Sequence, residues 1–253
     1  MTNIATIGIL GGMGPEATNQ LCALISANTT VAKDQDHIPV ITYNNSLIPS
    51  RERYAQGNGE SPVPEMIRTA RVLEAAGATF LLMPCNLAHL FWREVQEAIS
   101  IPLVNMIEET VKYIDEHHPQ SRRIGILAST PTIENGIYQQ ALRAHGRQLV
   151  APDAYDQTEF VMRAIYGAKG IKGGYKDAPR AMLTGAAKRL VAEGAELIIA
   201  GCTEVSLVLS SDNSPFTVVD PLEILARVAV ARAKLITEGE PREVSPVREW
   251  RGA

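Results

Sequence analysis

The chain has 253 residues, of which 45% are hydrophobic and 21% charged, a balance typical of one or two globular domains rather than of a disordered chain. Its 24 basic and 28 acidic side chains give a formal net charge of -4, so there is no electrostatic reason to expect a nucleic-acid partner. No apolar run approaches the ~18 residues that cross a membrane, and the N-terminus lacks a signal segment. Three cysteines are too few for a disulfide framework. We therefore expect free thiols, a cytoplasmic location and no membrane partner.

Strands and helices are predicted in alternation through the first half of the chain. The β-branched run at 4–10 predicts a strand, the glycines after it predict a turn, and Pro15 predicts a helix start. Further predicted elements are strands at 39–43, 79–83 and 102–106, a polar loop at 44–59 and a helix at 64–76 that ends before Gly77. This order predicts an α/β fold, a parallel sheet with helices on both faces.

The second half of the chain repeats the order of the first. Residues 7–10 (Ile-Gly-Ile-Leu) recur as residues 124–127, and residues 76–85 match residues 193–202, both at an offset of 117 positions. A third match, at an offset of 115, joins residues 102–105 to residues 217–220. Chance likeness of two α/β halves would not explain why both copies end a strand with a cysteine.

The duplication predicts two pseudo-symmetric, doubly wound parallel-sheet lobes that face each other across a cleft. We place the first lobe at residues 1–116 plus 221–253 and the second at residues 117–220. The tail is assigned to the first lobe because a helix predicted at 222–236 follows the last strand of the repeat.

Cys85 and Cys202 end equivalent strands, at the edge where open α/β sheets bind ligands. Both thiols precede a predicted helix, whose positive N-terminal end favours the thiolate. Two acid/base groups on opposite faces of one carbon can invert a stereocentre, because one removes a proton and the other returns one. The alternatives are a disulfide, which the cytoplasm disfavours, a single nucleophilic cysteine, which leaves the second thiol unexplained, and a metal site. The metal alternative is weak because His89 lies one helical turn after Cys85, but no histidine follows Cys202.

Five motifs between the first strand and about Glu223 carry a family resemblance. They are Gly-Gly-Met-Gly-Pro at 11–15, Asn-Asn-Ser-Leu-Ile-Pro-Ser-Arg at 44–51, Pro-Cys-Asn-Leu-Ala-His at 84–89, Ile165-Tyr166 with Gly170-Ile171-Lys172, and Gly-Cys-Thr-Glu at 201–204. Together they resemble the aspartate racemase family, a branch of the aspartate/glutamate racemase superfamily. The resemblance implies racemisation of a small-molecule amino acid, aspartate first, with no cofactor and no metal. It also implies that each chain has two facing α/β lobes and that two chains form a homodimer.

The resemblance also implies roles for individual residues. Cys85 and Cys202 match the two acid/base thiols, and Arg51 and Lys172 match the cations that hold the substrate carboxylates. The other matched substrate-binding positions are Met13, Asn86, Leu87, Ser129, Thr132 and Thr203. His89 is expected beneath the cleft, where it could steady the Cys85 loop. Glu204 either orients a neighbour of Cys202 or caps a helix.

The sequence departs from the family pattern at three positions and leaves alternatives open. Ser50 stands where the family has aspartate, Leu87 where threonine is usual, and Pro131 where glycine is common. Glutamate or a broad range of amino acids is therefore an alternative substrate, and another superfamily reaction (isomerase, decarboxylase or hydantoin racemase) or a non-catalytic binding protein is an alternative function. Residues 12–17 fit the dinucleotide fingerprint, but we interpret them as a backbone cradle for a substrate carboxylate.

Overall fold

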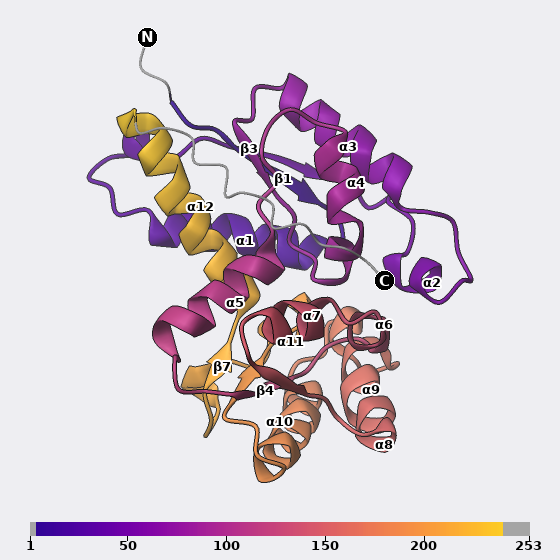
Figure 1. Cartoon of the computed structure of the whole chain (residues 1–253). Coiled ribbons are helices and arrows are strands. Elements are labelled where there is room, and N and C mark those ends of the chain that lie inside the picture. The colour runs from indigo at the N-terminus through magenta and orange to yellow at the C-terminus, as the bar shows by residue number, and fades with distance from the viewer. Residues whose placement is uncertain (1–3, 240–253) are drawn as a thin grey trace.

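The computed structural model describes residues 4–239, which form two parallel sheets with helices on both faces (Figure 1). The first sheet has the strand order β2 (Val40–Asn44), β1 (Ile7–Gly11), β3 (Phe80–Leu82). The second has the order β5 (Gln148–Val150), β4 (Arg123–Ile126), β6 (Leu197–Ile199), β7 (Val218–Val219). The strands in both are paired in parallel, so the predicted α/β class is confirmed.

The helices connect the strands in the predicted alternation. In the first half they are α1 (Pro15–Asn28), the short η1 (Asp34–Asp36), α2 (Arg51–Ala55), α3 (Val63–Ala75), η2 (Leu87–Phe91) and α4 (Trp92–Glu97). From there on they are α5 (Met106–His117), α6 (Thr130–Glu134), α7 (Ile137–Ala144), α8 (Ala154–Asp156), η3 (Gln157–Met162), α9 (Arg163–Tyr166), η4 (Ile171–Gly173), α10 (Asp177–Ala192), α11 (Thr203–Ser206), η5 (Ser211–Asn213) and α12 (Pro221–Glu238). Among residues 4–239, no helix combines the length and the apolarity needed to cross a membrane.

The internal repeat is visible in the strand register. Ile7 pairs with Phe80 in the first sheet, and Ile124 pairs with Leu197 in the second. Each residue of the second pair lies 117 positions after its counterpart in the first pair. Gly8 and Gly125 share a steric reason for being glycine. A Cβ on Gly8 would lie 2.8 Å from the Cβ of Ala78, and one on Gly125 would lie 3.0 Å from the Cβ of Ala195. The two lobes therefore repeat the same close packing inside each sheet.

The helices α5 and α12 each pack on the sheet of the other half of the chain. The buried side chains of α5 pack on β4, β6 and β7 of the second sheet, whereas those of α12 pack with α1 on β1 and β3 of the first. In Figure 1 the yellow α12 accordingly lies beside the indigo α1. The division of the chain near residues 116 and 221 stays a proposal, and residues 240–253 lie outside the described part of the chain.

Two predicted segments differ from the structure. The strand predicted at 102–106 is only an isolated bridge between Leu81 and Leu103. The carbonyl of Pro102 and the N–H of Val104 pair with the backbone of Leu81 at 2.7 and 2.9 Å, but the pairing ends there because Asn105 caps α5, which begins at Met106. The N–H of Leu103 donates to Gln96 Oε1 at 2.6 Å, and its carbonyl accepts from Trp92 Nε1 at 2.9 Å. The predicted loop at 44–59 also contains the short helix α2.

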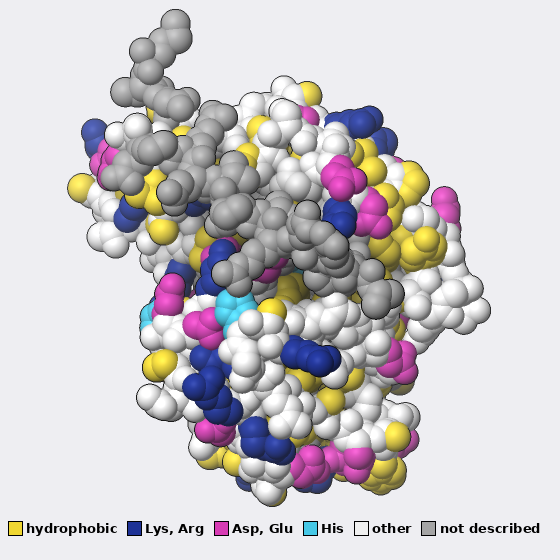
Figure 2. All heavy atoms as spheres, in the orientation of Figure 1, with side chains coloured by type: hydrophobic (Ala, Val, Ile, Leu, Met, Phe, Trp, Pro, Cys, Tyr) yellow, Lys and Arg dark blue, Asp and Glu magenta, His cyan; other side chains and the backbone are white. Residues whose placement is uncertain are grey.

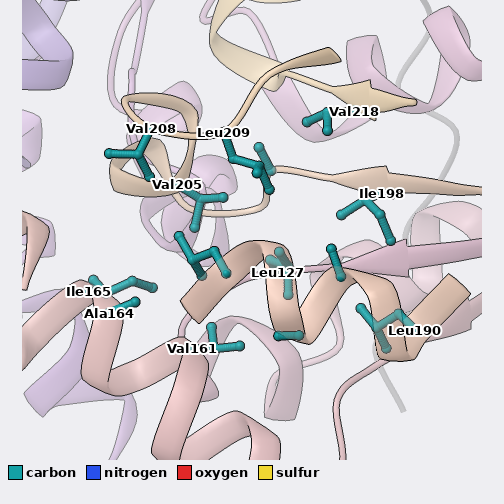
Figure 3. Close-up of a cluster of buried hydrophobic side chains, with 14 of the residues drawn as sticks. Leu127, Val161, Ala164, Ile165, Leu190, Ile198, Val205, Val208, Leu209 and Val218 are labelled. Atoms are coloured by element: carbon teal, nitrogen blue, oxygen red, sulfur yellow. The ribbon is translucent and has the colours of Figure 1, made fainter. Parts of the chain in front are cut away.

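Aromatic residues make up only 5% of the chain, and the core is mainly aliphatic, with Phe80, Phe91 and Tyr138 among its buried side chains. Figure 3 shows one of its parts, where Leu127 and Ile198 of the second sheet meet Leu190 of α10 and Val161 and Ile165 from the segment before it. On the face seen in Figure 2, basic and acidic side chains are interspersed, in keeping with the small net charge.

Candidate active site

A cavity of about 430 Å³ lies between the two lobes, at the carboxyl ends of their strands. It is lined by every site residue predicted from the sequence, namely Met13, Arg51, Cys85, Asn86, Leu87, Ser129, Thr132, Lys172, Cys202 and Thr203. Residues that the sequence reasoning did not assign to it also line the cavity, among them Ser46, Ile48, Glu52 and Tyr166. Tyr166 stands in one of the quoted motifs and Glu52 directly follows Arg51, which is the signal that could have indicated them.

The two thiols reach the cavity from equivalent strand ends. Cys85 follows β3 by three residues and is 8% exposed. Cys202 follows β6 by the same number and precedes the first residue of α11. Both cysteines are free. One thiol from each lobe therefore lines the same cavity.

His89 supports the loop that carries Cys85. Its Nδ1 lies 2.9 Å from the carbonyl oxygen of Cys85, and the N–H of Met106 donates to its Nε2 at 3.0 Å. This pair of contacts requires the neutral ring with the proton on Nδ1. Burial lowers the pKa of His89 to about 4, which also keeps the ring neutral. The imidazole thus holds the Cys85 backbone from beneath the cavity, which agrees with the position expected from the sequence.

Asn86 presents a hydrogen-bond donor to the cavity. Its Oδ1 accepts from the hydroxyl of Tyr138 at 2.6 Å, a bond that joins the two lobes. Its Nδ2 is buried, and it has no acceptor within the described part of the chain. A buried donor without a partner is costly, so a ligand oxygen in the cavity would satisfy it.

Arg51 is held at the start of α2 and keeps a free donor. Its guanidinium donates to the carbonyls of Ile48 and Pro49 at 3.2 and 2.9 Å. Among residues 4–239, its buried Nε finds no acceptor. Ser50, the departure from the family's aspartate, caps α2 because its Oγ accepts from the N–H of Arg53 at 3.2 Å.

Cys202 shares its side of the cavity with a carboxylate and an ammonium group. Its Sγ donates to Glu204 Oε2 at 3.0 Å, and Lys172 forms an ion pair with Glu204 Oε1. Lys172 Nζ also lies 5.4 Å from the ring centroid of Tyr166. Burial would raise the pKa of Glu204, but the charge of Lys172 and the hydrogen bonds from Cys202 and Lys172 hold it below its ordinary value. Glu204 thus accepts hydrogen bonds from the thiol of Cys202 itself and from two neighbouring side chains, those of Thr203 and Lys172.

The loop before α1 forms one wall of the cavity. Gly12 has φ +96°, and a Cβ there would lie 2.7 Å from the backbone nitrogen of Asn45, so only glycine fits. Thr18 ties the loop to the helix, because its hydroxyl accepts from Gly12 N at 3.0 Å and donates to the carbonyl of Gly14 at 2.9 Å. Met13, Gly14 and the positive end of α1 are thereby placed on the cavity.

The hydroxyl groups of Ser129, which precedes α6, and of Thr132 in α6 complete the polar lining of the cavity. Ser129 Oγ and Thr132 Oγ1 are 2.9 Å apart, and both residues are buried. Pro131 lies between them as the second residue of α6, a position where proline fits a helix start. Within the described residues, no group of three or more His, Cys, Asp or Glu side chains is placed to hold a metal ion.

Residues 10–229 match the family model of the Asp/Glu/hydantoin racemases. The broad specificity amino-acid racemase RacX of Bacillus subtilis is 28% identical over 233 residues, which are 89% of this chain and 96% of that protein. The solved aspartate racemase of Picrophilus torridus superposes with a TM-score of 0.81 at 27% identity, covering 91% of this chain and 94% of that one. The glutamate racemase of Francisella tularensis, solved with D-glutamate, superposes with a TM-score of 0.62 at 16% identity over 92% and 81% of the two chains, which is a likeness of fold.

Proposed function

The chain belongs to the Asp/Glu/hydantoin racemase family, and we propose that it racemises an amino acid, aspartate first, with Cys85 and Cys202 as the two acid/base groups and with no cofactor. The observation that carries the proposal is the meeting of one thiol from each lobe in a single cavity. Two strand ends related by the repeat supply the opposed groups that inversion needs.

The proposed reaction begins with one cysteine as a thiolate and the other as a thiol. The thiolate takes the α-proton, and the electron pair of the broken Cα–H bond spreads into the α-carboxylate. The thiol on the opposite face then loses its proton to Cα. The product is the other enantiomer, and the two cysteines have exchanged protonation states.

The substrate carboxylates are proposed to bind the donors that the cavity leaves open. Arg51 Nε and Asn86 Nδ2 are such donors, and the α1 loop at Met13 adds backbone N–H groups at a positive helix end. The ammonium group of Lys172 and the hydroxyls of Ser129, Thr132 and Thr203 complete the proposed binding set.

A second candidate function is racemisation of a broad range of amino acids. Lys172 is already paired with Glu204, so its charge is partly offset before any substrate enters. Leu87 adds an apolar wall where the family pattern has a hydroxyl. The similarity to the broad specificity racemase of Bacillus subtilis supports the same alternative.

The test is incubation with L-aspartate in deuterium oxide, followed by chiral separation and a deuterium count at the α-carbon. We expect D-aspartate that carries one deuterium. Cys85→Ser and Cys202→Ser should each reduce racemisation by orders of magnitude, with the fold retained by circular dichroism. Near-normal racemisation in either variant would refute the two-thiol assignment.

The substrate class is tested by kcat/KM for aspartate, glutamate, asparagine and alanine. A preference of at least tenfold for aspartate supports aspartate racemase, whereas equal values support the broad-specificity alternative. The homodimer and the cytoplasmic location remain proposals, and light scattering of the purified protein tests the first of them.

A further inference from the structure

The two thiols have different neighbours, although the repeat places them at equivalent positions. At the offset of 117 positions that relates Cys85 to Cys202, Leu87 corresponds to Glu204. Both side chains line the cavity and both residues are 7% exposed. Leu87 belongs to the apolar cluster that also contains Cys85. One thiol therefore has an aliphatic neighbour where the other has a carboxylate.

The two oxygens of Glu204 have separate partners. Oε2 accepts from the thiol of Cys202 at 3.0 Å and from the hydroxyl of Thr203 at 3.3 Å, while Oε1 faces the ammonium group of Lys172. An ionised carboxylate can only accept hydrogen bonds. Its bond with Cys202 therefore exists only while the sulfur carries a proton, and a thiolate there would place two negative charges in contact.

We propose that Glu204 is a positioning residue that holds Cys202 in its protonated form, so that in the resting enzyme Cys202 is the acid and Cys85 is the base. This inference rests on the two-thiol racemisation proposed above. In the resting form, Cys85 Sγ takes the α-proton of the enantiomer that faces it, and the Cys202 S–H proton passes to the opposite face of Cα. The other enantiomer reacts only with the form in which the proton has moved from Cys202 to Cys85.

The ionisation of Cys202 depends on several groups around it. Burial raises the pKa of Cys202 first, the charge and hydrogen bond of Glu204 raise it further, and the charge of Lys172 acts in the opposite direction. The titratable groups that face Cys202 are Glu204 and Lys172, Tyr166 of α9, Tyr138 of α7 and, from the other side of the cavity, Cys85. Glu204 and Lys172 are the two charged groups with opposite effects, which makes them separable by substitution.

The experiment measures how fast each cysteine reacts with iodoacetamide between pH 6 and pH 9, by peptide mapping in a mass spectrometer. The thiolate is the reactive form, and the reagent is neutral, so its approach does not depend on the charge of the cavity. Each cysteine is compared with itself between variants, because Cys85 is more buried than Cys202. Glu204→Gln should raise the rate at Cys202 about three- to tenfold at pH 7 for each pKa unit by which the thiol becomes more acidic.

Lys172→Met should change the alkylation rate at Cys202 in the opposite direction. Because it removes the cation that favours the thiolate, the rate at Cys202 should fall below that of the wild type. Glu52→Gln is the matched control, since Glu52 is the carboxylate that lines the same cavity from α2 of the other lobe. It should change the rate at Cys202 by less than twofold.

Three results would overturn the inference. They are an unchanged pH profile of Cys202 in Glu204→Gln, a faster reaction of Cys202 in both Glu204→Gln and Lys172→Met, which indicates a loosened cavity, and an equal effect of Glu52→Gln. Alkylation needs no turnover. A lack of racemisation in the wild type would therefore refute the proposed function and would still leave the protonation of Cys202 measured.

Discussion

The hydroxyl of Tyr138 donates a hydrogen bond of 2.6 Å to the side-chain oxygen of Asn86, and both residues are buried. Tyr138 belongs to α7 of the second lobe, whereas Asn86 directly follows Cys85 in the first. The bond fixes which way the amide of Asn86 faces, because its oxygen is occupied and its nitrogen is left for the cavity. A contact between lobes thus sets the orientation of a proposed substrate-binding group.

Tyr138→Phe should therefore weaken catalysis more than stability. Loss of one hydrogen bond costs about 0.5–1.5 kcal/mol of unfolding free energy, measured by urea denaturation. Misplacement of Asn86 should lower kcat/KM by roughly 10- to 100-fold, mainly through a higher KM. Tyr155→Phe is the control, since Tyr155 is 67% exposed. Unchanged kinetics in Tyr138→Phe would show that Asn86 does not need this bond.

The glycines inside the two sheets provide a test of the repeat in terms of stability. Gly8→Ala and Gly125→Ala would each place a methyl group against an alanine Cβ, at 2.8 and 3.0 Å. Overpacking of this kind should cost about 1–3 kcal/mol in each case.

A matched glycine-to-alanine substitution outside the sheets should raise the unfolding free energy instead of lowering it. Gly185 lies inside α10, where the nearest atom to a new Cβ is a terminal nitrogen of Arg189 at 3.7 Å. Gly185→Ala should therefore stabilise the protein by about 0.5–1 kcal/mol. If Gly8→Ala, Gly125→Ala and Gly185→Ala all had the same urea midpoint, close packing would not explain why glycine is needed inside the sheets.

The repeat and its two cysteines were predictable because the matching segments recur in the sequence at a fixed offset of 117 positions. The strand register then followed, since Ile7–Phe80 and Ile124–Leu197 are the same pair in two copies. The sequence analysis assigned the helix at 222–236 to the first lobe, and α12 packs on the first sheet. The packing of α5 on the second sheet was not predicted, because an apolar helix face does not specify which of two similar sheets it covers. The ion pair of Lys172 with Glu204 was also not predicted, since it joins residues 32 positions apart through the folding of a loop.

The strand predicted at 102–106 shows a different kind of failure. Its apolar pattern favours a strand, and the carbonyl of Pro102 and the N–H of Val104 do pair with Leu81. The strand extends no further because Asn105 already caps the helix that begins at Met106. Similarly, α2 is too short to show a helical period in the sequence.

Acid should destabilise the protein through His89. The pKa of this histidine in the folded state is about 4, below its ordinary value of 6.5, because the ring is buried. As the pH falls from 6.5 towards 4, His89 therefore binds a proton in the unfolded chain but stays neutral in the folded chain. The stability is complete above pH 6.5, and about 3 kcal/mol of it should be lost across that window.

The measurement is the urea-unfolding free energy at pH 7.0 and pH 4.5. The difference between the two values should be smaller in His89→Gln than in the wild type, even if the variant is less stable at both. His37→Gln, at an exposed position, should keep the wild-type difference. A wild-type difference in His89→Gln would assign the acid sensitivity to other groups.

The last prediction concerns Asp220, whose counterpart in the first lobe is Asn105. Each residue caps the helix that follows it: Asn105 Oδ1 accepts from Ile107 N at 3.1 Å, and Asp220 Oδ1 accepts from Leu222 N at 2.8 Å. Burial raises the pKa of Asp220 above its ordinary value of 3.8. Above pH 3.8 the folded chain therefore holds a proton that the unfolded chain releases, so this residue lowers stability as the pH rises through that window.

Asp220→Asn should remove this cost and keep the cap, because asparagine caps helices as well as aspartate does and already does so at the equivalent position. We expect the variant to be more stable than the wild type at pH 7, with the difference shrinking towards zero as the pH falls below 3.8. Urea-unfolding midpoints at pH 7.0, 5.0 and 3.5 measure it. Asn105→Ala is the control for a lost cap and should cost about 0.5–2 kcal/mol at every pH. If Asp220→Asn were destabilised at pH 7 as much as Asn105→Ala, the negative charge at the start of α12 would stabilise the fold, and the burial argument would be wrong.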